Sequence, residues 1–330
     1  MHRLKVGYFS QESQVQVLAL PIVGRPNDVH SITPIILFSQ PDDLYGAKEW
    51  KEETLKIYDK KYYDDHKIKP NPNDEDSRLI YFHVIHGVSI KKYGSKFGSS
   101  LDSALIASEE GITWIYFSAE DNVWYGESLG TGEMSQINKT GFKGSGNVDA
   151  GRVGDDAFAY IPTVEPFHGN TVAVYYKPKP KKTNKDKTEQ TNESKNSLTG
   201  CQWERVVLDV YDNPNPIGEG PGHFVVCADF DNDGDDEFLV ALRGPMPWQG
   251  VFYYKAIDVK NGVFAKCRVS SDSAARIAVA DFNGDGRLDF ATIGYSVAGY
   301  YTAENPSIVV YYNDFTLDED VKTAIALSKT

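Results

Sequence analysis

The 330-residue sequence is short of cysteine and of long apolar runs. Its three cysteines, Cys201, Cys227 and Cys267, are too few for a disulfide scaffold, and each lies in or beside a β-like run, so we expect buried thiols. No apolar run reaches the length that a bilayer requires, and the N-terminal MHRLKVGYFS lacks a signal-peptide core. We therefore expect a soluble, cytoplasmic protein with no membrane partner.

Basic residues are also in deficit, with 34 Lys and Arg against 47 Asp and Glu and a net charge of −13. A nucleic-acid backbone is therefore not expected as a partner, since binding it requires an excess of basic side chains. The lysines that do cluster lie in residues 177–198, a low-complexity stretch with acids interspersed and no aromatic residue. This composition predicts a disordered surface loop.

Long helical periodicity is scarce, whereas aromatic residues make up 12% of the chain and 28 residues are glycine. Short β-like runs recur throughout, which predicts an all-β chain folded as a β-propeller of four-stranded blades. In the first blade we place the fourth strand at Thr54–Tyr58, and the last blade lacks a clear fourth strand. Five blades are visible, at approximately residues 1–70, 71–140, 141–212, 213–270 and 271–314, and residues 315–330 are interpreted as the start of a following domain.

Two acidic loops repeat 281 − 229 = 52 residues apart, and each is flanked by β-forming residues. Each has carboxylate or amide oxygens at positions one, three, five and nine and a glycine at position six, a pattern that suits Ca²⁺ or Mg²⁺. We predict that both loops bind a structural cation, although acidic turns without metal are the simpler alternative. The predicted loop residues are Asp229, Asp231, Asp233, Asp235 and Glu237 in the first loop, and Asp281, Asn283, Asp285, Arg287 and Asp289 in the second.

Four of the seven histidines occupy related positions in the predicted blades. His2, His86 and His223 start innermost strands, and His168 lies between the second and third strands of its blade. Because successive strands alternate in direction, all four are predicted to line one rim of the channel, with Glu165 beside them. Histidine is the usual side-chain ligand of zinc, so the rim predicts a zinc site. The alternative for each histidine is a hydrogen-bonded structural role.

Several runs resemble a known family: MHRLKVGYFSQESQVQVLALPIV, GRVGDD, EPFHGNTV, VVCADFDNDGDDEFLVAL and YSVAGYY are similar to the propeller domain of the fungal aldos-2-ulose dehydratase (pyranosone dehydratase) family. The acidic loops alone also resemble FG-GAP and VCBS repeats. The resemblance implies dehydration of 2-keto sugars such as glucosone or 1,5-anhydro-D-fructose. It further implies a catalytic zinc in the propeller cleft and a structural divalent ion in a loop.

The family's propeller has seven blades and is followed by cupin domains, so the chain looks truncated at both ends. Closure of five blades into a smaller ring is the alternative. Whether the short chain is active, and whether it forms a homo-oligomer or needs the missing cupin domains, stays open at this point.

The resemblance places a β-elimination at the histidine rim. Glu165 or a histidine such as His168 is the candidate general base, and Tyr295 or Tyr300 is the candidate donor to the leaving hydroxyl. Two rivals remain. One is a calcium-stabilised propeller that binds sugar or protein without catalysis, and the other is a polysaccharide lyase in which Arg152 and Arg243 neutralise a uronate.

Overall fold

The computed structural model describes residues 1–74, 77–92, 101–134, 142–178, 203–211, 215–244 and 246–315. The chain divides into two compact units. The first comprises Met1–Val148, Glu165–Phe167 and Ser197–Trp203, and the second comprises Asp149–Val164, His168–Asn196 and Glu204–Thr330. Nearly all of the predicted loop 177–198, all but the first residue of the predicted tail 315–330, and Cys201 lie outside the described residues.

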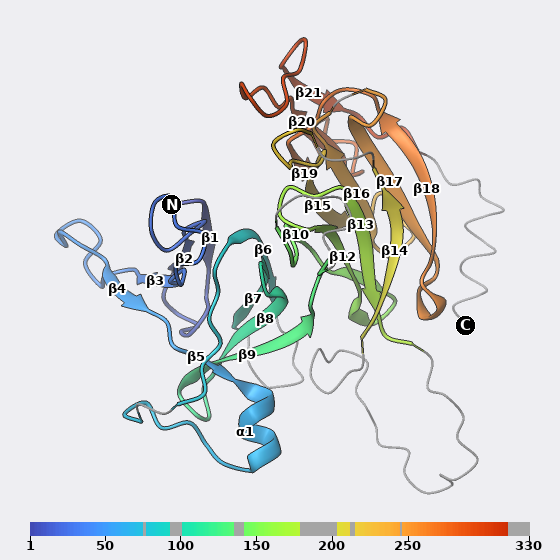
Figure 1. Cartoon of the computed structure of the whole chain (residues 1–330). Coiled ribbons are helices and arrows are strands. Elements are labelled where there is room, and N and C mark those ends of the chain that lie inside the picture. Colours follow the sequence, from blue (N-terminus) through green and yellow to red (C-terminus); the bar gives the residue numbers. More distant parts are fainter. Residues whose placement is uncertain are drawn as a thin grey trace, which may run out of the picture. The chain divides into compact units, whose positions relative to one another are not determined.

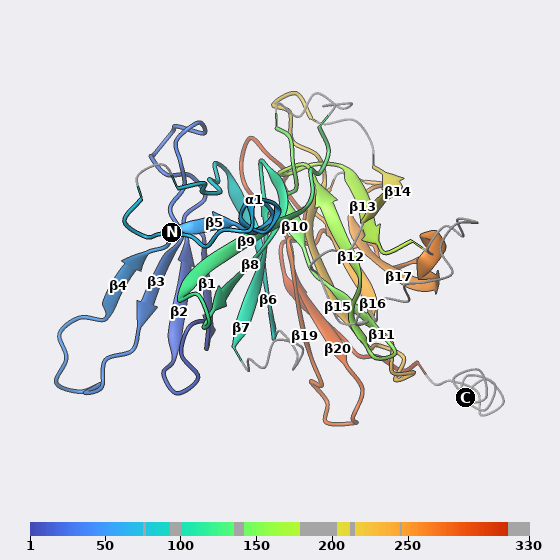
Figure 2. The same ribbon diagram turned by 90° about the horizontal axis from the view of Figure 1, so that it is seen from below.

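The first sheet of the first unit is an antiparallel sheet in the order β1-β2-β3-β4 (Figure 2). Its strands are β1 (Arg3–Gly7), β2 (Gln16–Leu20), β3 (Ile36–Ser39) and β4 (Lys51–Thr54). The prediction of a fourth strand at Thr54–Tyr58 is wrong, because β4 ends at Thr54 and β5 (Ile57–Asp59) pairs with the next sheet. The reason is burial: β4 is fully exposed and charged, as suits an edge strand, whereas Ile57 and Tyr58 are buried.

The second sheet has the order β5-β9-β8-β7-β6, with β5 parallel to β9 and the other pairs antiparallel. Its remaining strands are β6 (Ile85–Lys92), β7 (Asp102–Ser108), β8 (Gly111–Ser118) and β9 (Val123–Gly130), and the short β10 (Asn147–Val148) contacts β6 and β7. A helix that we did not predict, α1 (Lys60–His66), follows β5 and contacts β9 (Figure 1). The side chain of Asp59 caps it by accepting from the amide of Tyr62, and Lys67 ends it in the left-handed conformation at φ 54°.

One acid of the first unit has a strongly shifted pKa. Burial raises the pKa of Glu127, on β9, to about 7, although the hydroxyl of Tyr116 donates a hydrogen bond to its Oε1 at 3.0 Å and opposes the shift. Between pH 4.5, the ordinary pKa of a glutamate, and about pH 7, Glu127 therefore keeps its carboxyl proton in the folded state more than it does in the unfolded chain. The contribution of Glu127 to stability consequently falls as the pH rises through this window.

We expect Glu127→Gln to raise the free energy of unfolding above pH 7 and to leave it unchanged near pH 4. The amide keeps an oxygen for the Tyr116 hydroxyl but cannot ionise, so the gain at pH 8 should be about 2 kcal/mol, allowing for partial solvent screening. Urea unfolding at pH 4, 6 and 8 measures it. Glu120→Gln is the control, since that side chain is 84% exposed. A gain that is equal at all three pH values would contradict the assignment to Glu127.

The third sheet belongs largely to the second unit, and β11 forms a hairpin with β12, which is followed by β13 and β14. These strands are β11 (Gly151–Val153), β12 (Asp156–Glu165), β13 (Thr171–Tyr176) and β14 (Glu204–Val210). The alternating Val172 and Val174 of β13 are buried in the core that this unit shares between its sheets.

The fourth and fifth sheets complete the second unit (Figure 1). The fourth has β15 (Gly222–Ala228), β16 (Glu237–Leu242), β17 (Gly250–Asp258) and β18 (Val263–Ser270), with a 3₁₀ turn, η2 (Val259–Asn261), before β18. The fifth has β19 (Arg276–Ala280), β20 (Asp289–Ile293) and β21 (Ile308–Tyr311). The predicted all-β class with five blade sheets is confirmed, and the fifth sheet has three strands among the residues that the structure describes.

Two smaller expectations have different outcomes. Cys267 is a free thiol but is exposed, so the prediction that it is buried is wrong. It lies on β18, whose side chains are almost all exposed because β18 is the outer strand of its sheet.

No helix in the described part of the chain is long and apolar enough to cross a membrane.

Candidate functional site

The second unit holds a pair of neighbouring histidines, His168 and His223, whose ring centroids are 5.1 Å apart. As predicted, His223 lies at the start of the innermost strand β15 and His168 lies in the turn between β12 and β13. His168 has φ 47°, a conformation that non-glycine residues seldom adopt and that often marks functional turns. Nδ1 of His223 donates to the carbonyl oxygen of Ala275 at 2.6 Å.

His168 is paired with a carboxylate that sequence reasoning missed. Its Nδ1 lies 2.7 Å from Oε2 of Glu219, and the same oxygen lies 2.5 Å from a guanidinium nitrogen of Arg243. Burial lowers the pKa of His168, with the Arg243 charge adding to the effect and Glu219 opposing it. Burial alone would raise the pKa of Glu219, but His168 and Arg243 outweigh it and the pKa is lowered. Near neutral pH the group is thus a neutral imidazole beside a carboxylate–guanidinium pair.

Arg243 is fully buried, and its guanidinium lies over the rings of two tyrosines. The ring centroids of Tyr295 and Tyr301 lie 4.8 Å and 5.1 Å from its central carbon, and Tyr295 also lies 5.5 Å from His223. The predicted Tyr295 is therefore part of this cluster, which we call the His168 cluster: His168, Glu219, His223, Arg243, Tyr295 and Tyr301. Tyr300 is 45% exposed, and its neighbour Tyr301 is the one that is buried against Arg243.

The backbone around His168 is locked to the turn that carries Glu219. The amide of Gly220 donates to the carbonyl of His168 at 2.7 Å, and the amide of Gly222 donates to the carbonyl of Gly169 at 2.8 Å. A Cβ on Gly220 would lie 2.4 Å from the carbonyl carbon of Gly169, so only glycine allows this approach. The GEGPGH run before β15 was the signal in the sequence: an acid between glycines, just ahead of a predicted site histidine.

The first unit holds the other two predicted histidines. The rings of His2 and His86 are 4.9 Å apart, and Nδ1 of His86 donates to the carbonyl of Gly146 at 2.7 Å. The edge of Phe167 packs on His86 at 4.8 Å. Glu165, the predicted base, is fully buried at the end of β12 and is grouped with this first unit. Each pair is formed within its own unit, and the common rim of four histidines stays a prediction.

These histidines share one feature that bears on metal binding. In His86 and His223 a backbone carbonyl accepts from Nδ1, so the neutral ring carries its proton there and its lone pair on Nε2. In His168 a carboxylate oxygen of Glu219 lies 2.7 Å from Nδ1, a contact that favours the same tautomer. Metal-ligating histidines typically donate a hydrogen bond from the N–H of their other ring nitrogen to a carboxylate or backbone carbonyl in this way. The three residues therefore have the donor chemistry that a zinc site requires.

The first acidic loop is preorganised by its own backbone. Asp229 accepts from the amides of Asp233 and Gly234, and Glu237 accepts from the amide of Phe230. One oxygen each of Asp229, Asp231 and Asp233 lies within 4.8 Å of the others, a spacing that could hold a cation. The Nζ atom of Lys255 lies among the carboxylates, 2.5 Å from Asp231, 3.0 Å from Asp233 and 2.9 Å from Glu237.

The second acidic loop has the same skeleton. Asp281 accepts from the amides of Asp285 and Gly286, and Asp289 accepts from the amide of Phe282, which repeats the pattern of the first loop. Asn283 accepts from the amide of Asp285. The side chain at the seventh position already has a partner in both loops. Asp235 accepts from the amide of Gly154, and Arg287 pairs with Asp285 of its own loop. Any ligand from that position would be the backbone carbonyl.

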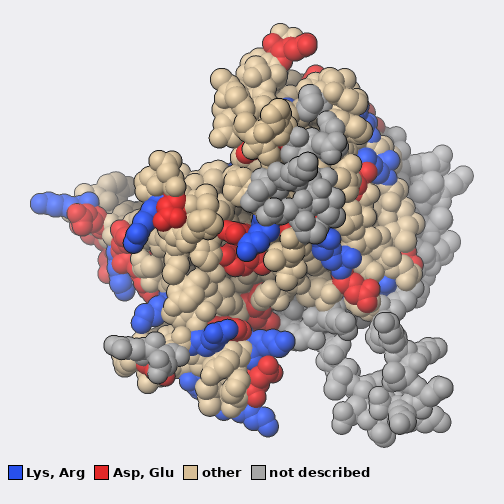
Figure 3. Space-filling model, viewed as in Figure 1, with Lys and Arg blue, Asp and Glu red and all other residues tan. Residues whose placement is uncertain are grey.

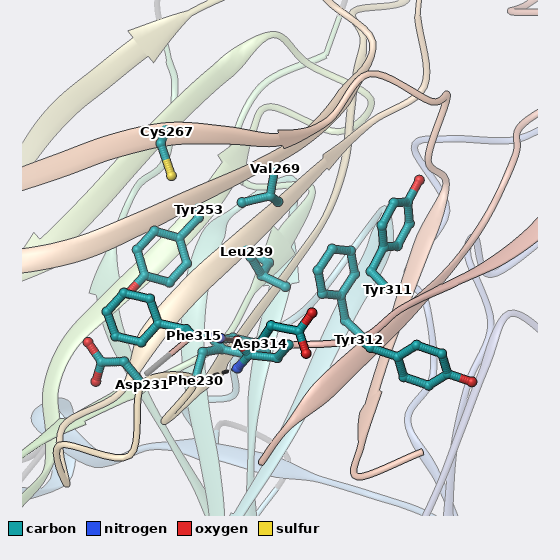
Figure 4. Close-up of a pocket in the computed structure, with 12 residues that line it drawn as sticks. Phe230, Asp231, Leu239, Tyr253, Cys267, Val269, Tyr311, Tyr312, Asp314 and Phe315 are labelled. Atoms are coloured by element: carbon teal, nitrogen blue, oxygen red, sulfur yellow. Dashed lines mark hydrogen bonds between the residues drawn. The ribbon is translucent and has the colours of Figure 1, made fainter. Parts of the chain in front are cut away.

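A cavity of about 330 Å³ lies beside the first acidic loop, within the second unit (Figure 4). It is lined mainly by apolar and aromatic side chains, with Asp231 at one edge: Phe230, Asp231, Leu239, Tyr253, Cys267, Val269, Phe290, Tyr311, Tyr312, Asn313, Asp314 and Phe315. Its lining contains no histidine and no residue of the His168 cluster, so it is separate from the predicted catalytic residues, although it includes Asp231 of the first acidic loop.

On the face shown in Figure 3, Lys and Arg side chains lie among Asp and Glu side chains, and the coloured residues show no broad basic patch.

Comparison with known proteins gives two matches. A model of the aldos-2-ulose dehydratase β-propeller domain matches residues 1–80 and 57–178, which together cover more than half of the chain. A curated relative, the aldos-2-ulose dehydratase of Phanerodontia chrysosporium, is 35% identical over 333 residues, covering 99% of this chain and 33% of the relative. The chain thus spans about a third of the length of that relative.

Proposed function

Because this chain belongs to the aldos-2-ulose dehydratase β-propeller family, we propose that it carries out the zinc-dependent dehydration of a 2-keto sugar. Aldos-2-uloses such as glucosone, or 1,5-anhydro-D-fructose, are the proposed substrates. The observation that carries the proposal is the His168 cluster, in which a buried carboxylate, itself paired with a buried guanidinium, contacts a histidine in the turn between β12 and β13. A purely structural turn does not require such a costly buried charge pair.

The donor set fits zinc, because three histidines carry their lone pairs on Nε2 and are fixed through Nδ1. His2, His86, His168 and His223 are the proposed ligands. When bound, zinc would supply a Lewis acid that stabilises negative charge developing on the substrate's carbonyl oxygen. In the acidic loops, Ca²⁺ or Mg²⁺ is the proposed structural cation.

The chain's own residues would handle the protons. In the proposed elimination, Glu165 or a histidine not bound to metal takes the proton α to the carbonyl, and Tyr295 or Tyr300 gives a proton to the β-hydroxyl. The C–H and C–O bonds break, a C=C bond forms, and one water leaves. Tyr295 is the better placed tyrosine for this role because it lies against His223 and Arg243, whereas Tyr300 is exposed.

The rival lyase function is less well supported by the arginines. Arg243 is fully buried and paired with Glu219, and Arg152 faces Asp229 and Asp236 at 3.9 Å and 3.6 Å. Arg243 is thus enclosed with its own carboxylate, and Arg152, although 42% exposed, already faces two carboxylates. This favours a neutral keto sugar over an acidic polymer as substrate.

The test combines metal analysis with turnover. We expect purified protein to contain about one zinc per chain besides any hard cation, and to convert 1,5-anhydro-D-fructose or glucosone into a conjugated enone that absorbs in the ultraviolet. A uronic-acid polymer should not react. Calcium or magnesium without zinc, and no consumption of either sugar, would contradict the proposal and favour the binding-module alternative.

A further inference from the structure

We infer that Glu219 is a positioning residue that fixes the orientation and the tautomer of His168, an inference that rests on the proposed function of the His168 cluster. The carboxylate would act through His168 and would not touch substrate. Its role is to keep the proton on Nδ1, so that Nε2 is the nitrogen presented to a metal or to a substrate proton.

One oxygen of Glu219 is shared by two partners. Oε2 of Glu219 faces both Nδ1 of His168 at 2.7 Å and Arg243 at 2.5 Å, and the Glu219 side chain is only 7% exposed. Arg243 is always charged and so keeps the carboxylate ionised. An ionised carboxylate has no proton to donate, so its contact with Nδ1 at 2.7 Å favours the neutral tautomer that carries the proton on Nδ1 over the one that places a lone pair there.

Glu219 itself is held rigidly. Its amide donates to the side chain of Asn215 at 3.0 Å, and its carbonyl accepts from the hydroxyl of Tyr301 at 2.7 Å. Arg243 also donates to the next carbonyl, that of Gly220, at 2.9 Å. With backbone and side chain both fixed, the carboxylate has one position, and His168 is fixed with it.

The histidines differ in what orients them. His86 and His223 are oriented by backbone carbonyls, those of Gly146 and Ala275, which substitutions leave in place. His168 depends on a side chain. The chain also contains a second histidine–carboxylate pair, His83 and Glu110, with 2.6 Å between Nδ1 and Oε1 but with side chains 35% and 31% exposed. That pair is a matched control, because water can replace its carboxylate.

The experiment compares Glu219→Gln with Glu110→Gln. Glutamine keeps the shape and an acceptor oxygen for Arg243, whereas Glu219→Ala would remove both the acceptor and the volume beside a buried guanidinium and endanger folding. Imidazole ¹⁵N NMR on metal-free protein reports the tautomer of His168. Zinc affinity is measured by competition with a chromophoric chelator, and kcat and KM are measured with 1,5-anhydro-D-fructose.

We expect wild-type His168 to be a single Nδ1–H tautomer and the Glu219→Gln variant to show a mixture. Zinc affinity should fall by roughly 10–100-fold, and kcat should fall more than KM changes. Glu110→Gln should match wild type in all three. An unchanged tautomer together with unchanged zinc affinity in Glu219→Gln would overturn the inference. If wild type binds no zinc and turns over no sugar, the proposed function fails, and the tautomer measurement still decides the role of Glu219.

Discussion

Replacing His168 with alanine is expected to lower kcat/KM for a 2-keto sugar by roughly 10²–10⁴-fold, the range typical of a lost proton-transfer group, without unfolding the protein. The fold should survive because Glu219 and Arg243 keep each other as partners when the imidazole is removed, so no buried charge is left alone. Steady-state kinetics together with the zinc content of the purified variant measure the effect.

The same reasoning gives the controls for His168→Ala. His223→Ala should lose activity to a similar degree, since its ring lies 5.1 Å from that of His168. His83→Ala should not, because His83 pairs with Glu110 on a partly exposed surface. Turnover at the wild-type rate with unchanged zinc content in His168→Ala would remove this residue from the mechanism.

The acidic loops show what sequence spacing can predict. The spacing of Asp229 to Glu237, and of Asp281 to Asp289, predicts two tight acidic turns. In both turns the first and ninth residues accept hydrogen bonds from amides of the same loop, whereas cation binding stays a prediction. Such hydrogen bonds are local, within seven residues of each other, so the sequence pattern contains both partners. The positions of His86 and His223 near the starts of β6 and β15 were also predicted from sequence spacing.

Tertiary contacts explain what sequence reasoning missed. Glu219 and His168 are 219 − 168 = 51 residues apart, and no local pattern links them. Tyr300 and Tyr301 are both aromatic, and only packing against Arg243 selects the second. The error at Thr54–Tyr58 has the same origin, because the choice of sheet for Ile57 depends on the core that it enters, not on its own β propensity.

Lys255 is a contact of this tertiary kind, and it distinguishes the two acidic loops. In the fourth sheet Phe238 pairs with Tyr254, and in the fifth Phe290 pairs with Tyr311, so the next residues are Lys255 and Tyr312. The first loop thus has an ammonium among Asp231, Asp233 and Glu237, where the second has a tyrosine that is 60% exposed. Burial alone would lower the pKa of Lys255, but the three carboxylates outweigh it and raise the pKa, so the charge persists.

Replacing Lys255 with methionine is therefore expected to make stability depend strongly on a divalent cation. Without metal, three crowded carboxylates lose their common counter-charge, and the free energy of unfolding should fall by about 3 kcal/mol. Calcium should restore most of this, since a cation bound at a hundred times its dissociation constant stabilises the folded state by about 2.7 kcal/mol. Urea unfolding in a chelator and in millimolar calcium measures both effects.

Lys266→Met is the matched control for Lys255→Met. Its side chain is similarly exposed, at 32% against 30%, but it pairs with one carboxylate, Asp209, at 2.7 Å. Removing the Lys266 ammonium should lower the free energy of unfolding by less and should add no calcium dependence. Any calcium effect at the second loop is the same in every variant, so it does not affect the comparison. A Lys255→Met protein that is as stable as wild type in chelator would mean that the carboxylates do not need the ammonium. In that case Lys255 would not be needed to stabilise the first acidic loop, just as Tyr312 is not needed for the second.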